Sequence, residues 1–216
     1  MLILLGLVLI TIGMTGGGLL LLAVWLGCDF LVLGIAHARG AHGIFGKRQD
    51  GSIPVWSWLV FLPLFIYIII VWHVIRIFSR EPALNRVSND LVIGRRLLPS
   101  ELEGEFENYI DLTAEFVEPA VIRQAPGYYS YPILDGAAPE AKSLRAAVDR
   151  LRPGRTFIHC AQGHGRTGLF ALAVLLKCGL TPTVDEGLRM LRAVRPGVRL
   201  NRSQRRCIED LAAISF

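Results

Sequence analysis

Two long stretches of this chain carry almost no charge, and they constrain its fold more than any other feature. Asp29 is the only charged residue in 2–36, and 51–75 has none. The part from 80 to 216 holds 19 of the 23 Lys and Arg residues and 16 of the 18 Asp and Glu residues. This distribution excludes a disordered chain, a collagen-like chain and a simple soluble domain. It predicts a membrane region, 1–79, joined to a globular domain of ordinary size, 80–216.

Segment 55–75 has the length and composition of a membrane-spanning helix, which needs about 20 apolar residues. Trp56, Trp58 and Trp72 lie near its ends and fit the aromatic belt of a membrane interface. Pro63 lies inside it, and membrane helices tolerate proline. We therefore expect one span here, with a buried helix of a soluble protein as the alternative.

Segment 2–36 allows more than one interpretation. As one helix it would be about 50 Å long, which exceeds a single untilted span. Three consecutive glycines at 16–18 favour a turn, so a helical hairpin of 2–14 and 19–36 is one solution, and a single tilted helix is another. A cleaved signal peptide is a third, although the start lacks basic residues. Two or three transmembrane helices follow, with Asp29 expected at an interface.

The basic residues that flank the last predicted span give its orientation. The loop 37–54 before it carries three Lys and Arg residues. The chain after it carries five, Arg76, Arg80, Arg86, Arg95 and Arg96. Because basic residues accumulate on the cytoplasmic side, we expect a multi-pass membrane protein whose C-terminal domain is cytoplasmic.

The C-terminal domain alternates short strands with helices, after a polar linker predicted at 80–90. The apolar patterns predict strands at 91–93, 109–112, 128–134 and 156–159. They predict helices at 138–151, 167–178, 184–195 and 202–213, the last two opened by the capping pairs Thr183 with Glu186 and Asn201 with Gln204. The expected fold class is α/β (α+β), with a central sheet flanked by helices.

A glycine-rich loop between a predicted strand and a predicted apolar helix carries the strongest motif, TFIHCAQGHGRTGLFALAVLL from residue 156. Residues 163–168 match G-x-G-x-x-G, with Asp185 or Glu186 as the acidic partner. A dinucleotide-binding fold, however, needs that acidic residue at the end of a second parallel strand, whereas 183–195 is a predicted helix. The dinucleotide interpretation is therefore disfavoured.

The same loop also reads as Cys160-x5-Arg166-Thr167, a pattern suited to phosphate-ester cleavage. A loop that leads into a helix N-terminus directs backbone N–H groups at a phosphate and favours a thiolate on Cys160. Arg166 offers a planar fork to two phosphate oxygens, and Thr167 can donate to the departing thiolate. The predicted phosphate-binding loop comprises Ala161, Gln162, Gly163, His164, Gly165 and Arg166.

HCAQGHGRTG resembles the signature loop of the cysteine-dependent protein tyrosine phosphatase superfamily, and its surroundings look most like the dual-specificity branch. The resemblance covers roughly 88–213. LVIGRRLLPSE is similar to the entry strand of that branch and YIDLTAEF to its second strand, which gives Asp111 and Glu115 structural roles. In this family the general acid is an Asp on a loop before the nucleophile. The resemblance assigns that role to Asp135, 25 residues before Cys160.

Together with the predicted membrane region, the resemblance implies a membrane-anchored phosphatase. It implies a cysteinyl-phosphate intermediate and no metal or other cofactor. Phosphorylated proteins are the leading substrate class, and no nucleic-acid partner is expected. The absence of Lys and Arg from 161–165 disfavours a polyphosphorylated inositol head group. A phospholipid monoester of the phosphatidylglycerol-phosphate type is the first alternative. A phosphate-binding module without turnover is the second.

Seven arginines and no acidic residue lie between Gly187 and Cys207. A solvated charged face is the expected structure, and a surface for anionic lipid or phosphorylated substrates is the alternative. The arginines are Arg189, Arg192, Arg195, Arg199, Arg202, Arg205 and Arg206. Of the two histidines at the loop, His159 is expected to be buried, and His164 to lie near substrate.

Overall fold

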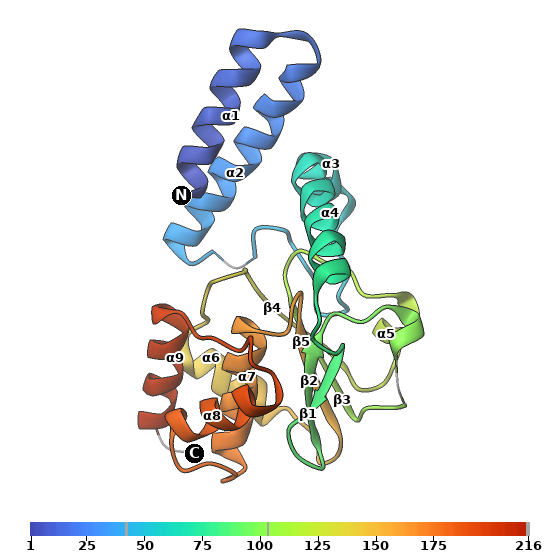
Figure 1. Cartoon of the computed structure of the whole chain (residues 1–216), viewed down its shortest axis with the longest axis vertical. Helices are drawn as coiled ribbons and strands as arrows, with labels where there is room; N and C mark the ends of the chain where they lie inside the picture. The colour runs from blue at the N-terminus through green and yellow to red at the C-terminus, as the bar shows by residue number, and fades with distance from the viewer. Residues whose placement is uncertain (42, 103, 215–216) are drawn as a thin grey trace. The chain divides into compact units, whose positions relative to one another are not determined.

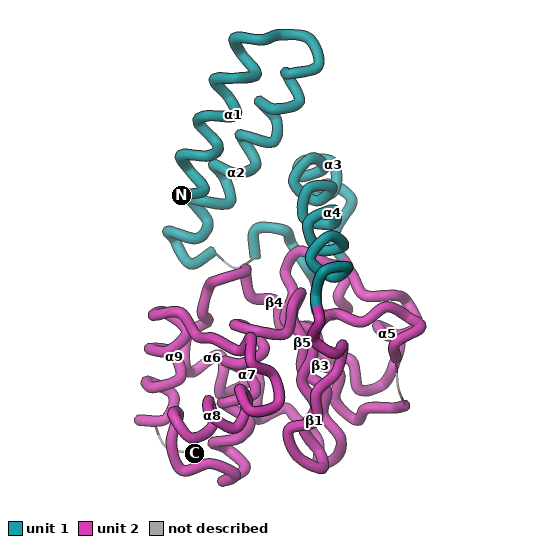
Figure 2. The backbone as a smooth tube through the Cα atoms, viewed as in Figure 1, with its two compact units in different colours: residues 1–47, 53–79 teal, residues 48–52, 80–216 magenta. Residues whose placement is uncertain are grey.

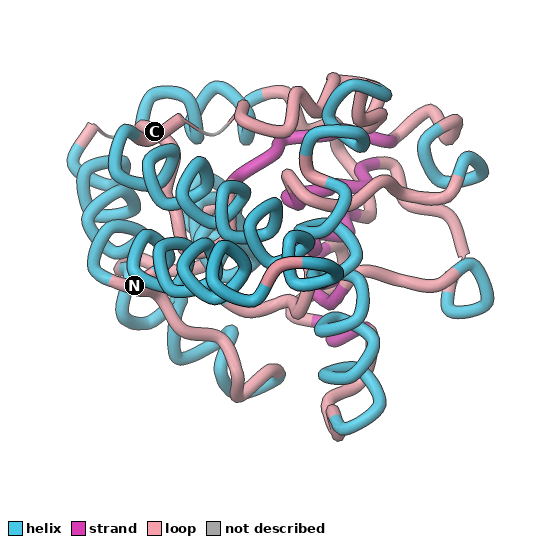
Figure 3. Tube along the Cα trace, turned by 90° about the horizontal axis from the view of Figure 1, so that it is seen from above, coloured by secondary structure: helices cyan, strands magenta, loops and turns pink. Residues whose placement is uncertain are grey.

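The computed structural model describes residues 1–41, 43–102 and 104–214, and the chain forms two compact units (Figure 2). Unit 1 comprises Met1–Lys47 and Ile53–Ser79, and unit 2 comprises Arg48–Ser52 and Arg80–Phe216. Helices make up most of the described chain, and the strands form a single group (Figure 3).

Unit 1 begins with a helical hairpin, the first of the alternatives for its N-terminal segment. Helix α1 (Leu2–Gly16) and helix α2 (Leu21–Arg39) are joined by Gly17 and the short 3-10 helix Gly18–Leu20. The two helices approach closely at Gly6 and Gly27, where an added Cβ would lie 2.6–2.7 Å from the opposite backbone oxygen. Small residues at such crossings let helix backbones pack together in an apolar environment.

The single helix predicted over 55–75 is wrong, because the structure divides it. Helix α3 (Val55–Val60) ends at Phe61, and helix α4 (Leu62–Phe78) starts anew with Pro63 in its first turn. Proline lacks the N–H that a continuous helix would need, but the first turn leaves that group unused. The second half of the segment thus becomes the longer helix.

One helix within 1–41, 43–102 and 104–214 is long and apolar enough to cross a membrane, namely Gly18–Arg39. Leu2–Gly16 and Leu62–Phe78 are apolar but shorter. Asp29 lies in the middle of α2 and is buried inside unit 1, not at a helix end as expected. The structure therefore supports one membrane span, Gly18–Arg39, by length and composition. The shorter helices Leu2–Gly16 and Leu62–Phe78 support the predicted multi-pass arrangement more weakly.

Unit 2 is built on a five-stranded mixed sheet with the order β1-β2-β5-β3-β4 (Figure 1). Its strands are β1 (Leu84–Arg86), β2 (Leu91–Arg95), β3 (Asn108–Thr113), β4 (Tyr128–Ile133) and β5 (Thr156–Cys160). Strand β1 is antiparallel to β2, and the other neighbours are parallel. Strand β1 lies in the predicted linker 80–90, so this part of the linker is ordered as an edge strand.

Helices cover both faces of the sheet, as the predicted fold class requires. Helices α6 (Ala141–Asp149), α7 (Gly165–Lys177), α8 (Val184–Val194) and α9 (Arg202–Ala213) form one layer, and the short α5 (Ala120–Arg123) lies on the other side (Figure 1). The short 3-10 helix Pro99–Glu101 lies between β2 and β3. The α/β prediction is confirmed, and both predicted helix caps are present at Thr183 and Asn201.

Alternate residues of the central strands face opposite sides of the sheet. On β5, Ile158 packs into the larger core with α7, whereas Phe157 packs into a second core with Tyr109 and Ile122. Period-two alternation of this kind is what a strand buried on both faces requires. Helix α7 is buried along most of its length between the sheet and the other helices. This burial fixes the loop that joins β5 to α7.

Candidate active site

The loop between β5 and α7 folds around the sulfur of Cys160. Cys160 ends β5 and is buried, and the backbone N–H of Gly163 donates to its Sγ at 3.3 Å. Gly163 has φ +76°, and a Cβ at this position would collide with the carbonyl of Gly94 on β2. Glycine is therefore required for this close approach.

Arg166, in the first turn of α7, is held rigidly by a carboxylate from another part of the chain. Its Nη1 and Nη2 donate to the two oxygens of Glu115, each at 2.8 Å, and Nη1 also donates to the carbonyl of Ile133 at 3.0 Å. Burial alone would lower the pKa of Arg166, but the charges of Glu115 and of the other acidic groups raise it above its usual range. The guanidinium is thus a fixed positive charge with a fixed orientation.

The structure also brings Asp135 to the loop. Its Oδ1 lies 3.1 Å from Nη2 of Arg166, and its side chain is 86% exposed. Asp135 follows the end of β4, which is parallel to β3, so the sheet delivers it to the same edge as Cys160. Thr167 Oγ1 is buried and has no hydrogen-bond partner within the described parts of the chain. All four predicted catalytic residues therefore lie at or directly beside one loop.

The prediction that all seven arginines of 187–207 lie on a solvated face is wrong for Arg195, which is buried. It is 1% exposed, whereas the other six arginines of that run are exposed. Its Nε donates to the carbonyl of Gly163 at 3.0 Å and its Nη2 to the carbonyl of Gln162 at 2.8 Å. Arg195 therefore holds the backbone of the predicted phosphate-binding loop. The spacing of Leu188, Leu191 and Arg195 on the apolar stripe of the predicted helix could have indicated this burial.

A second group of buried polar residues, Asp111, Glu118 and His159, comes together in a way that the sequence did not predict, although Asp111 was expected to be structural and His159 to be buried. Each of these three residues has an atom that could bind a metal ion, and these atoms lie within 4.8 Å of one another. The oxygens of Asp111 accept hydrogen bonds from Thr113 and Tyr128 at 2.7–2.9 Å. Glu118 forms an ion pair with Arg96 at 2.8 Å. The carboxylates of Asp111 and Glu118 are thus bound by Thr113, Tyr128 and Arg96, and His159 is buried as expected.

The geometry defines what the site can do. The sulfur of Cys160 accepts a hydrogen bond from a loop amide, and a fixed guanidinium in the same loop segment pairs with the carboxylate of Asp135. Such a set can bind a tetrahedral dianion, attack its central atom and exchange a proton with a leaving oxygen. These are the parts that hydrolysis of a phosphate monoester requires.

Comparison with known proteins finds a viral relative in sequence and phosphatases of similar fold. No protein-family profile matches the chain. A protein of Invertebrate iridescent virus 3 named "Putative tyrosine phosphatase 067L" is 32% identical over 88 residues. The match covers 36% of this chain and 35% of the viral protein, so it spans about a third of that relative.

Solved structures of tyrosine and dual-specificity phosphatases share the fold of unit 2. The active form of Tk-PTP matches with a TM-score of 0.52 and 22% identity, over 61% of this chain and 97% of that one. A mouse putative dual specificity phosphatase complexed with zinc tungstate gives 0.50 and 17%, over 63% and 90%. PTPMT1 in complex with PI(5)P gives 0.50 and 12%, over 62% and 100%. The resemblance expected from the loop is thus confirmed for the fold.

Proposed function

We propose that this chain is a cysteine-dependent phosphatase that hydrolyses phosphate monoesters through a cysteinyl-phosphate intermediate. The observation that carries the proposal is the arrangement around Cys160. The amide of Gly163 points at its sulfur, and Arg166 is locked in the same loop by two hydrogen bonds to Glu115. The fold and the viral relative support the same class of enzyme.

The proposed reaction has two steps. In the first, the Cys160 thiolate attacks phosphorus, the S–P bond forms, and the P–O bond to the leaving group breaks while Asp135 donates a proton to that oxygen. In the second, the Asp135 carboxylate takes a proton from water, which attacks phosphorus and breaks the S–P bond. The Thr167 hydroxyl donates to the thiolate as it leaves. Arg166 and the loop amides stabilise the charge on the phosphoryl oxygens.

We propose membrane attachment of the enzyme through the helix Gly18–Arg39, with residues 1–79 as the membrane region and 80–216 as the catalytic domain. A multi-pass arrangement with a cytoplasmic catalytic domain rests on the charge distribution around 55–75. Phosphorylated proteins are the first substrate class that we propose. A phospholipid monoester is the second, because an anchored site can reach lipid head groups and because a protein of the same fold binds PI(5)P.

The substrate class is tested with the full chain in detergent micelles or lipid nanodiscs. Phosphate release is measured from a phosphotyrosine peptide, a phosphoserine peptide and phosphatidylglycerol-phosphate. A preference for the peptides supports the protein substrate, and a preference for the lipid supports the second class. Tungstate binding without release from any of the three would contradict catalysis and indicate a phosphate-binding module.

The Asp135→Asn substitution is expected to lower kcat by about 10²–10⁴-fold, the usual contribution of a general acid. The loss should be largest for a poor leaving group such as the serine alkoxide and smallest for p-nitrophenolate, which leaves without a proton. Asp149→Asn is the matched control, since Asp149 pairs with Arg145 on α6 and with Lys177 at the C-terminal end of α7, the end opposite the loop. Equal losses for both leaving groups would contradict the assignment of Asp135.

A further inference from the structure

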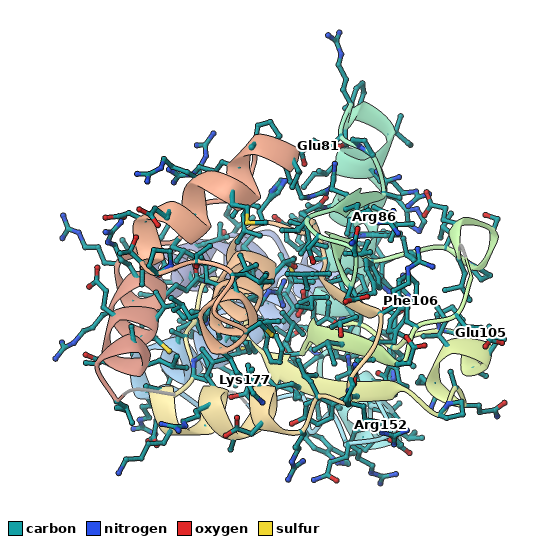
Figure 4. All side chains as sticks on the ribbon, turned by 90° about the horizontal axis from the view of Figure 1, so that it is seen from below. Glu81, Arg86, Glu105, Phe106, Arg152 and Lys177 are labelled. Carbon is teal, nitrogen blue, oxygen red and sulfur yellow. The ribbon has the colours of Figure 1, made fainter. Side chains whose placement is uncertain are left out.

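His164 of the phosphate-binding loop contacts a carboxylate from outside the loop. Its Nε2 donates to Oε2 of Glu81 at 2.5 Å, across 83 residues of sequence. Glu81, labelled in Figure 4, lies in the short segment between α4 and β1. The other carboxylate oxygen of Glu81 accepts the backbone N–H of Gly197 at 3.0 Å. One side chain thus joins the loop to the turn that follows α8.

Arg195 extends this connection. Its Nη2 lies 3.4 Å from Oε2 of Glu81, and its Nη1 donates to the carbonyl of Pro82 at 2.9 Å. The same guanidinium holds the carbonyls of Gln162 and Gly163 in the loop. Two residues of the segment after α4 and two of the loop therefore share one buried cation.

The connection packs closely against the backbone at Gly197. A Cβ at Gly197 would overlap Nε2 of His164 and lie 2.8 Å from Oε1 of Glu81. Glycine at this position is therefore required by the approach of the imidazole ring. The backbone φ of Gly197 is outside the left-handed region, so alanine would affect this contact without straining the chain.

Glu81 is ionised at neutral pH. Burial raises the pKa of Glu81, but the hydrogen bond from His164 and the charges of Arg195 and His164 outweigh burial and lower it. A lowered folded-state pKa contributes stability above the unfolded value, near 4.3, and the contribution is lost as the pH falls through the folded value. The difference in unfolding free energy between the wild type and Glu81→Gln should therefore shrink on acidification, as measured by chemical denaturation at several pH values.

We propose that Glu81 is a positioning residue of the phosphate-binding loop, which it holds in its anion-binding shape through His164, Gly197 and Arg195. The inference rests on the proposed function and extends it. His164 then acts as an anchor of the loop, and its Nε2 faces Glu81 rather than the bound phosphate. The segment after α4 becomes part of the support of the site.

The test compares the full chain in detergent with its Glu81→Gln and Gly197→Ala variants, and Glu186→Gln is the matched control. Glu186 is an exposed glutamate of α8 whose carboxylate lies 3.7 Å from Arg189. For Glu81→Gln we expect the Kd for inorganic phosphate and the KM for the phosphate-ester substrate each to rise about tenfold, as for loss of one charge-assisted hydrogen bond. The fall in kcat should stay below about threefold, because the reacting groups remain.

Gly197→Ala should raise the Kd and the KM as well. The double variant should have a Kd and KM no higher than those of the more affected single variant, because both changes break the same contact between Glu81 and His164. Thermal unfolding checks that each variant is folded, and if Glu81→Gln fails to fold, Gly197→Ala decides. If Glu81→Gln binds phosphate with the same Kd and has the same KM as Glu186→Gln, while activity still depends on Cys160, the role of Glu81 is overturned and the proposed function stands. A wild type that neither hydrolyses phosphate esters nor binds phosphate would overturn the proposed function as well.

Discussion

Replacing Cys160 with serine is expected to reduce phosphate release by the full chain at least about 10⁴-fold, as removal of the nucleophile does in known covalent hydrolases. The serine hydroxyl is not ionised at neutral pH, so it cannot form the covalent phosphoenzyme at a comparable rate. The rest of the site is unchanged, because Arg166 is held by Glu115 and not by the sulfur. Tungstate should therefore still bind, with a Kd close to that of the wild type.

Cys178→Ser is the matched control for this experiment. Cys178 is exposed at the end of α7, and its replacement should leave the rate unchanged. Rapid quenching of the wild type with a radiolabelled substrate should trap phosphate on the protein, and the label should be absent from Cys160→Ser. Equal rates for the two serine variants would contradict a thiolate mechanism.

The Glu115→Gln substitution is expected to reduce both stability and catalysis. Glu115 is the bidentate partner of Arg166, and both side chains are buried. Removing Glu115 leaves the buried guanidinium without its buried counter-ion, since the remaining acidic partner, Asp135, is largely exposed. Breaking a buried pair typically lowers the free energy of unfolding by about 3–5 kcal/mol. The amide of glutamine also turns an N–H group toward the guanidinium. Because Arg166 then loses its fixed orientation, kcat/KM should fall by about 10²–10³-fold.

Glu118→Gln separates the two effects. Glu118 is a buried glutamate that pairs with Arg96 at 2.8 Å, so its loss should also reduce stability. Glu118 pairs with Arg96, whereas Arg166 pairs with Glu115 and Asp135. The fall in kcat/KM should therefore be much smaller for Glu118→Gln when both variants are assayed well below their melting temperatures. If the two variants lose activity in proportion to stability alone, the positioning role of Glu115 is contradicted.

The sequence predicted the elements of unit 2 well, because their signals are local. The apolar run after the glycine-rich loop predicted 167–178, and α7 spans Gly165–Lys177. The strand predicted at 156–159 is β5, Thr156–Cys160. Periodicity, capping residues and glycine turns act over a few neighbouring residues, and they do not depend on the rest of the fold.

The errors in unit 1 and at the unit boundary have physical causes of a different kind. Strand β1 is three residues long and has little periodicity of its own, so pairing with β2 decides it. The break at Phe61 depends on whether Pro63 enters the interior or the first turn of a helix, and both are compatible with an apolar sequence. The hairpin of α1 and α2 depends on packing between helices, which glycines permit but do not require.

A local pattern was enough to predict the loop chemistry: a cysteine, glycines, an arginine and a threonine at fixed spacing between a strand and a helix. The residues that hold this loop could be found only in the folded chain. The Arg166–Glu115 pair spans 51 residues, and the His164–Glu81 pair spans 83. A charged residue in a buried strand or on an apolar helix stripe indicates that a partner must exist, because an unpaired buried charge is costly. Which residue serves as the partner follows from the order of the strands in the sheet, and no local pattern encodes that order.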